Sequence, residues 1–228
     1  MFLLLICVII MGYVHNHREA TVQANSSDLG TNSSNCKQID NEFTVAIDPG
    51  HGGVDSGTLA FNEKFEEKKI NLAVAKCVQK KLENQTGIKV LLSRDDDSYL
   101  SPEERTEWMN GMNMDLCISI HCNSADNLDA TGVEVLYQEG VKGKVSKKLA
   151  KACLDSILER TGQVDRGLLG GDGIYIVRNA KMPIALIEIG FISNEQELAY
   201  LRKERNQELI AEGIVNAIKQ MKGMKKKK

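Results

Sequence analysis

The sequence predicts a single α/β domain in which one sheet is covered by helices on both faces. Two observations favour this class. Short runs rich in β-branched residues alternate with segments of helical periodicity through residues 41–218, an order typical of α/β proteins. The chain has 228 residues, of which 26% are charged, and this is the size and composition of one core-forming domain. Intrinsic disorder and collagen-like structure are therefore excluded.

Six runs of aliphatic and β-branched residues are predicted strands. They span residues 43–47, 88–92, 116–120, 132–137, 174–177 and 185–189. In sheets of this class, functional groups gather just past the carboxyl ends of the strands. The residues that follow these runs are therefore the candidates for a site.

Four other segments are predicted helices. Three of them repeat apolar side chains at intervals of three and four residues. The remaining one begins with Ser101, Pro102 and Glu104, a capping box with proline at the first helical position. The four helices span residues 66–85, 101–114, 142–160 and 205–221.

The ends of the chain differ from its body. Residues 1–24 are predicted to be a signal peptide or an N-terminal membrane anchor, because Met1–Val14 are apolar and carry no charged side chain. Residues 25–41 read as a polar linker, residues 42–221 as the domain and residues 222–228 as a basic tail. We therefore expect export to the cell envelope or beyond, with the protein either secreted or anchored by its N-terminus.

The net charge of −2 hides an uneven distribution, since residues 41–218 carry −7 and the last ten residues carry +6. An acidic body argues against nucleic acid as a partner, because binding to phosphates needs a clustered basic face. The lysine tail is either a solvated end or a contact with an anionic polymer or membrane surface.

Six cysteines occur in the chain, and their contexts do not suggest disulfides. Cys77 and Cys153 fall at core-facing positions of predicted helices, and Cys117 lies inside an apolar run. Free cysteine behaves as a small buried hydrophobe in such positions. We therefore expect mostly free thiols.

The domain contains two histidines, and each directly follows a predicted strand: His51 lies in a Gly-rich turn, and His121 follows the third strand. Two imidazoles and one carboxylate are the protein ligands of a catalytic zinc site. Glu63, Glu66 and Glu67 lie near the start of the first predicted helix. Any of the three could supply the carboxylate, and spacing alone does not choose among them.

Glu188 is a different case, because it lies inside the apolar run ALIEIG. An acidic side chain there costs free energy unless it has a partner or a function. The sequence thus leaves two interpretations, a structural ion pair or a catalytic group.

Five sequence blocks resemble the zinc-dependent N-acetylmuramoyl-L-alanine amidases of amidase family 3, in that family's order and over about residues 43–220. The blocks are VAIDPGHGGVDSG, EKKINLAVA, SRDDDSYLSPEERTEWMN, DLCISIHCNS and GIYIVRNAKMPIALIEIGFISN. The resemblance implies a mixed six-stranded sheet flanked by helices. The connection between Tyr137 and the helix predicted from residue 142 is short, without the inserted autoinhibitory helix of some activator-controlled relatives. A compact domain with only an N-terminal membrane-directed segment resembles the spore-cortex and germination branch of the family.

The resemblance also implies the roles of four residues. One Zn²⁺ would be held by His51, Glu67 and His121, and Glu188 would be the catalytic acid and base. The implied substrate is peptidoglycan, cleaved at the amide bond between N-acetylmuramic acid and L-alanine of the stem peptide. Whether a regulatory protein partner is needed stays open.

Three further residues are weaker candidates. Asn123 and Arg94 are predicted to donate hydrogen bonds to the substrate or to the loops at the sheet ends. A loop hydrogen bond and a surface charge are the corresponding alternatives. Asp48, three residues before His51, is predicted to orient that imidazole or to form the turn before Pro49.

Other classes of function agree less well with the sequence. A cysteine hydrolase would use Cys122 or Cys117, but it gives no role to the glutamate at the start of the first helix. The Gly-rich turn matches neither phosphate-binding pattern. A non-enzymatic wall-binding module is disfavoured because all four implied catalytic positions are present.

Overall fold

The computed structural model describes residues 42–60, 64–140 and 142–225. The predicted leader, the whole of the predicted linker and the last three lysines lie outside these ranges. Within them, no helix combines the length and the apolar character that crossing a membrane requires.

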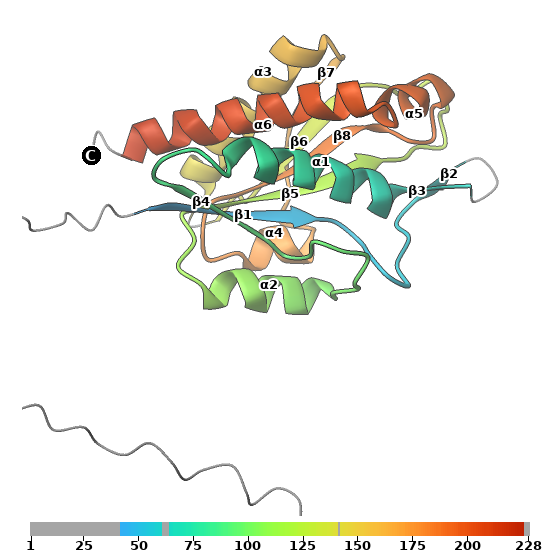
Figure 1. The fold of residues 1–228 in the computed structure, drawn as a ribbon. Helices are drawn as coiled ribbons and strands as arrows, with labels where there is room; N and C mark the ends of the chain where they lie inside the picture. Colours follow the sequence, from blue (N-terminus) through green and yellow to red (C-terminus); the bar gives the residue numbers. More distant parts are fainter. Residues whose placement is uncertain (1–41, 61–63, 141, 226–228) are drawn as a thin grey trace, which may run out of the picture. The chain divides into compact units, whose positions relative to one another are not determined.

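A six-stranded mixed sheet forms the centre of the domain, as predicted (Figure 1). The strand order is β4-β1-β5-β8-β6-β7. Each neighbouring pair is parallel apart from β8 and β6, which are antiparallel to each other. These strands are β1 (Phe43–Pro49), β4 (Ile88–Leu92), β5 (Leu116–Asn123), β6 (Val133–Tyr137), β7 (Asp165–Gly170) and β8 (Ile184–Phe191). A separate hairpin pairs β2 (Leu59–Ala60) with β3 (Phe65–Glu66).

Helices cover both faces of the sheet, which confirms the predicted layers. Figure 1 shows α1, α3 and α6 on one face and α2 and α4 on the other. The helices are α1 (Glu67–Leu82), α2 (Pro102–Gly111), α3 (Gly143–Thr161), α4 (Tyr175–Asn179), α5 (Glu195–Leu201) and α6 (Glu204–Lys225). Helix α6 continues past the predicted end of the domain, so the first part of the basic tail is helical.

Alternate residues of the central strands face the two helical layers. Val45 and Ile47 of β1 belong to the core cluster that includes α1, α3 and α6. Ala46 between them packs in the other cluster with Met109 of α2 and Val177 of α4. Parallel strands buried on both faces appear in a sequence as nearly continuous apolar runs, which is why these strands were predictable.

The strand predicted at residues 174–177 is wrong, because most of this run lies in α4. Ile176 and Val177 both pack on the sheet from one helical turn. The sixth strand is β7, an edge strand with the sequence DRGLLG, which is largely exposed and has no alternating apolar pattern.

Two local predictions are confirmed. The Ser101 hydroxyl accepts a hydrogen bond from the Glu104 amide at 3.1 Å, and Glu104 Oε2 accepts one from the Ser101 amide at 2.8 Å, so the capping box is present. The described cysteines are free thiols: Cys77, Cys117, Cys122 and Cys153.

Candidate metal centre

The carboxyl ends of β1, β5 and β8 lie side by side in the parallel part of the sheet. His51 follows the end of β1, and His121 lies near the end of β5. Glu188 of β8 is the register partner of His121. All three residues line one pocket of about 260 Å³. The sheet topology therefore brings together three of the four residues implied as catalytic.

Glu67, the fourth residue, begins α1 and places its carboxylate between the two imidazoles. Its Oε1 atom lies 3.2 Å from His51 Nε2 and 3.1 Å from His121 Nδ1. One potential ligand atom of each of the three residues lies within 4.8 Å of the other two. The imidazoles meet edge to face, with ring centroids 4.9 Å apart.

This cluster has the donor types and spacing of a metal site. Donor atoms around a tetrahedral zinc ion, each about 2.0–2.1 Å from it, lie about 3.4 Å apart. The two nitrogen-to-oxygen distances of 3.2 Å and 3.1 Å are close to that value. The residues present therefore fit a metal ion, with the pocket beside them as room for a substrate.

His51 is held in a left-handed backbone conformation by its neighbours. Its φ of 62° is the one positive value of a non-glycine residue among the described residues, and such a conformation costs about 1–2 kcal/mol. Arg105 Nη2 donates to the His51 carbonyl at 2.6 Å, and Asp55 Oδ2 lies 2.8 Å from His51 Nδ1. The contact with Asp55 directs the other ring nitrogen, Nε2, toward Glu67.

The ionisation of His51 reflects these carboxylates. Burial alone would lower its pKa, but Glu67 and Asp55 raise it to about 9. In the metal-free protein the imidazole thus carries a proton that a metal ion would replace.

Two glycines let the backbone approach the cluster. A Cβ atom on Gly50 would meet the His121 ring at 2.2 Å. A Cβ atom on Gly57, whose φ is +66°, would meet Glu67 Oε2 and the His51 ring at 2.7 Å. Only glycine permits this packing.

Main-chain and side-chain donors fix the Glu67 carboxylate. Oε2 accepts from the Thr58 amide at 2.9 Å, and Oε1 accepts from the Cys122 amide at 3.0 Å and from Asn71 Nδ2 at 3.1 Å. Burial alone would raise the pKa of Glu67, but the two imidazoles hold it well below its usual range. The carboxylate is thus ionised and oriented, as a metal ligand must be.

The other glutamates that spacing left open take no part in this cluster. Glu66 pairs with Lys68 and Lys69 instead. Glu63 lies outside the described residues.

Glu188 lines the pocket, and one of its carboxyl oxygens lacks a hydrogen-bond partner. Its Oε2 is buried and accepts no hydrogen bond from any part of the chain that the structure describes. Burial raises the pKa of Glu188 to about 7. A carboxyl group with a pKa near neutrality can both accept and donate a proton there.

Arg94 serves the loops at the sheet ends, which is one of its two predicted roles. It donates to the carbonyls of Pro49 at 3.0 Å, Gly50 at 2.9 Å and Lys68 at 3.0 Å. Only 3% of Arg94 is exposed, and the pocket that holds Glu188 is not lined by it. Its predicted contact with substrate is therefore not supported.

Asn123 is half-buried at the end of β5. Its Nδ2 donates to Glu134 Oε2 at 3.4 Å, and its Oδ1 accepts from the Ser124 amide at 2.8 Å. These contacts organise the loop after β5. Donation to a substrate stays a prediction.

The predicted contact between Asp48 and His51 is wrong. Asp48 is fully buried and lies opposite Ser119 in the β1–β5 register. Its carboxylate accepts a hydrogen bond from Ser119 Oγ at 2.8 Å and another from Arg105 Nη1 at 2.7 Å. The carboxylate that contacts the imidazole is Asp55, in the loop itself.

Replacing Arg105 by methionine is expected to destabilise the domain by about 3–5 kcal/mol, because Asp48 would remain as an unpaired buried charge. The change also removes donors to the carbonyls of Pro49 at 2.9 Å and His51 at 2.6 Å. Unfolding in urea at neutral pH measures the effect. Arg160→Met, which breaks an exposed pair with Glu212, is the matched control and should cost at most about 1 kcal/mol.

The pairing of Asp48 with Arg105 also predicts how the loss of stability in Arg105→Met depends on pH. Burial alone would raise the pKa of Asp48, but Arg105 and two serine hydroxyls hold it below its usual value. The stability that this ionised group contributes is present above about pH 3.9 and is lost as the pH falls through the lower pKa of the folded state. The difference in free energy of unfolding between the natural protein and Arg105→Met should therefore become smaller in acid. Equal losses of stability in Arg105→Met and Arg160→Met would contradict the assignment of a buried pair to Arg105 and Asp48.

The proposed cysteine nucleophiles are inert. Cys122 and Cys117 are both buried, and burial raises the pKa of both thiols well above its usual value. A reactive cysteine needs the thiolate. The structure thus argues against a cysteine hydrolase.

Comparison with known proteins adds an independent observation. The sequence profile of a family described as N-acetylmuramoyl-L-alanine amidase matches residues 45–220. This range contains both imidazoles, Glu67 and Glu188.

Individual relatives agree with this match. The Bacillus subtilis (strain 168) protein YqiI, which is described as uncharacterized, is 39% identical over 175 residues, 77% of this chain and 82% of its own length. The germination-specific N-acetylmuramoyl-L-alanine amidase of the same organism is 32% identical over 188 residues, 76% of this chain and 77% of its own. The crystal structure of an N-acetylmuramoyl-L-alanine amidase from Clostridium difficile 630 superposes with a TM-score of 0.78 at 36% identity, and the match covers 81% of this chain and 99% of that one.

Proposed function

Since the chain belongs to the N-acetylmuramoyl-L-alanine amidase family, we propose that it hydrolyses peptidoglycan with one zinc ion and one glutamate. The bond cleaved is the amide between N-acetylmuramic acid and L-alanine of the stem peptide. The observation that carries this proposal is the buried Glu67 carboxylate held between two imidazoles beside a pocket that Glu188 lines.

His51 Nε2, Glu67 Oε1 and His121 Nδ1 are the proposed zinc ligands. The close agreement between their separations and those of a tetrahedral zinc site supports this choice. When bound, zinc supplies Lewis-acid polarisation of the scissile carbonyl and makes water more acidic.

Glu188 is proposed to move the protons of the reaction. Its carboxylate, which lines the pocket and has a pKa of about 7, accepts a proton from the attacking water and later delivers a proton to the departing alanine amine. The bond to the carbonyl carbon forms from the water oxygen, and the carbon–nitrogen bond breaks. Asn123 is proposed as a donor to the substrate at the end of β5.

We also propose that the protein works outside the cytoplasm. The apolar run Met1–Val14 within the first 24 residues supports export, with these 24 residues either a cleaved signal peptide or a membrane anchor. Residues 25–41 would then be a linker and residues 42–221 the catalytic domain. Peptidoglycan lies on that side of the membrane, so the predicted location agrees with the proposed substrate.

Digestion of purified peptidoglycan tests the proposed function. Residues 41–228 should release free L-alanine amino termini without new reducing ends, and a chelator should stop the release. Vegetative and spore-cortex peptidoglycan are compared side by side because a germination-specific amidase is among the relatives. New reducing ends alone, or activity that survives the chelator, would contradict the proposal.

A further inference from the structure

Lys68 is a buried cation beside the metal centre, and the mechanism proposed above gives it no role. It follows Glu67 directly at the start of α1, and only 6% of the residue is exposed. Its Nζ donates to the Gly53 carbonyl at 2.7 Å and to Asp97 Oδ2 at 2.9 Å. Glu66 Oε1 lies 3.5 Å from the same nitrogen. Lysine is rarely buried to this extent unless it is paired, so the partners of Lys68 indicate what it holds in place.

Lys68 and Asp97 together hold both polar backbone groups of Gly53. Asp97 Oδ1 accepts from the Gly53 amide at 3.1 Å, while Lys68 Nζ donates to the carbonyl of the same residue. Gly53 has a φ of 55°, and a Cβ atom there would lie 2.9 Å from Tyr99 Cβ. The loop between β4 and α2 and the first turn of α1 thus meet on one residue of the loop after β1.

Gly53 belongs to a closed turn that ends at the partner of His51. The Gly52 amide donates to the Asp55 carbonyl at 2.8 Å, and the Asp55 amide donates to the Gly52 carbonyl at 3.0 Å. Asp55 Oδ2 lies 2.8 Å from His51 Nδ1. Because the turn is closed by these two hydrogen bonds, a displacement of Gly53 also displaces Asp55. The side chains that hold Gly53 therefore act on the imidazole of His51 without touching it.

We propose that Lys68 and Asp97 are positioning residues of the metal centre. They fix the turn from Gly52 to Asp55, which keeps Asp55 on Nδ1 of His51 and Nε2 directed toward the metal position. Groups that orient a ligating histidine contribute about 10–100-fold to metal affinity. The inference rests on the metal site of the proposed function, but not on the substrate or on the bond that is cleaved.

The zinc affinity of Lys68→Met tests this assignment, because electrostatics alone predicts the opposite change. Removal of a positive charge beside a cation site would strengthen zinc binding. Loss of the contact with Gly53 should instead weaken it at least about tenfold. Asp97, whose side chain is 59% exposed, stays solvated without its partner, so the variant should fold. Competition with a chromogenic chelator measures the dissociation constant of zinc in the full-length protein.

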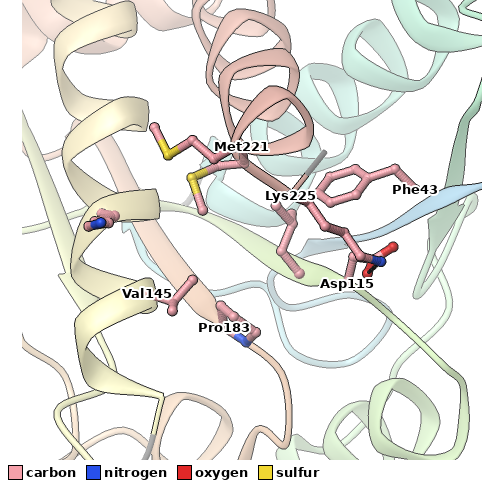
Figure 2. A pocket seen from close by; sticks show the side chains of 9 residues that line it. Phe43, Asp115, Val145, Pro183, Met221 and Lys225 are labelled. Carbon is pink, nitrogen blue, oxygen red and sulfur yellow. Dashed lines mark hydrogen bonds and ion pairs between the residues drawn. The ribbon is translucent and has the colours of Figure 1, made fainter. Parts of the chain in front are cut away.

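Lys225 supplies a matched control at the other end of β1. It pairs with Asp115, and Asp115 Oδ2 accepts from the Thr44 amide at 2.9 Å (Figure 2). One aspartate thus binds a lysine and a backbone amide here too, but at the start of the strand, whereas His51 follows its end. Lys225→Met removes the same charge and should leave zinc affinity within about twofold.

Asp97→Asn shows whether the two side chains act together. The asparagine oxygen can still accept from the Gly53 amide, but the side chain no longer pairs with Lys68, so zinc binding should weaken. The double variant should bind zinc within about twofold of Lys68→Met alone, because changes within one hydrogen-bond network are not additive. Additive losses would mean that Lys68 and Asp97 act separately, which contradicts the proposal.

A measurement on the metal-free protein separates this inference from the proposed function. The proton between His51 Nδ1 and Asp55 should exchange slowly with solvent in the natural protein and in Lys225→Met. It should exchange at least about tenfold faster in Lys68→Met, as followed by NMR of isotope-labelled histidine. A natural protein that binds no zinc would contradict the proposed function, while these exchange rates would still decide whether Lys68 positions His51.

Three outcomes would overturn the inference. Zinc binding that is unchanged or tighter in Lys68→Met would leave electrostatics as the only effect of the lysine. Equal zinc losses in Lys68→Met and Lys225→Met would assign the effect to the general stability of the domain. Equal exchange rates in the natural protein and Lys68→Met would mean that the turn holds Asp55 on His51 without the lysine.

Discussion

Glu188→Gln is expected to lower turnover about 10³-fold, or about 4 kcal/mol in the barrier, while the protein keeps its metal and its fold. The amide has the shape of the carboxyl group but cannot take a proton from water or return one to the leaving amine. Glu188 is not among the three residues whose ligand atoms cluster, so the metal content should stay at about one ion per domain. The buried Oε2 has no partner to lose, so the melting temperature should not fall.

Glu134→Gln is the matched control for this change. Glu134 lies opposite Glu188 in the β6–β8 register, but it does not line the catalytic pocket. Initial rates of alanine amino-terminus release, with metal content measured on the same samples, compare the two variants. A large loss in Glu134→Gln with little loss in Glu188→Gln would reverse the roles of the two carboxylates, and metal loss in Glu188→Gln would make it a ligand.

The parts of the fold that the sequence predicts are those buried on both faces. Strands β1, β5 and β8 appear as continuous apolar runs because helices cover both sides of each. An edge strand such as β7 has no such requirement, and its two glycines and exposed residues hide it. The run that includes α4 has the composition of a strand, but in the structure it is a short helix that packs Ile176 and Val177 on the sheet.

Some residues of the candidate site could likewise be predicted from the sequence, and others could not. The position of both histidines after strand ends is visible in the sequence, because topology alone brings parallel strand ends together. The choice of Glu67 over Glu66 needed the family resemblance, since only the orientation of the first residues of α1 separates them.

The supporting contacts were harder to predict. Asp55 reaches His51 because the turn between them takes a left-handed conformation, with a φ of 62° at His51, which local sequence does not specify. Asn71 lies four residues after Glu67 on α1 and donates to it, a spacing that could have identified it. The fixed geometry of the site thus depends on the conformation of the loop as much as on the ligands.

Glu67→Gln is expected to remove the metal and to lower turnover at least about 10³-fold, because the Lewis-acid contribution of several kcal/mol is lost with it. The glutamine oxygen can accept from only one of the two amides that hold the carboxylate, because Thr58 donates to Oε2 and Cys122 to Oε1. Losing one acceptor should cost about 1–3 kcal/mol, so the domain should remain folded. Metal analysis after purification in excess zinc, together with the rate of alanine amino-terminus release, measures both effects.

Glu66→Gln is the matched control for Glu67→Gln, because it makes the same chemical change at the preceding residue. Glu66 pairs with Lys69 at the surface, so its loss should cost at most about 1 kcal/mol of stability and leave about one zinc per domain. Zinc lost from Glu66→Gln but retained by Glu67→Gln would move the ligand by one residue and rotate the start of α1. Zinc retained by both variants would mean that the two imidazoles hold the metal with a carboxylate other than these two, and Glu188, in register with His121, would then be the first to replace.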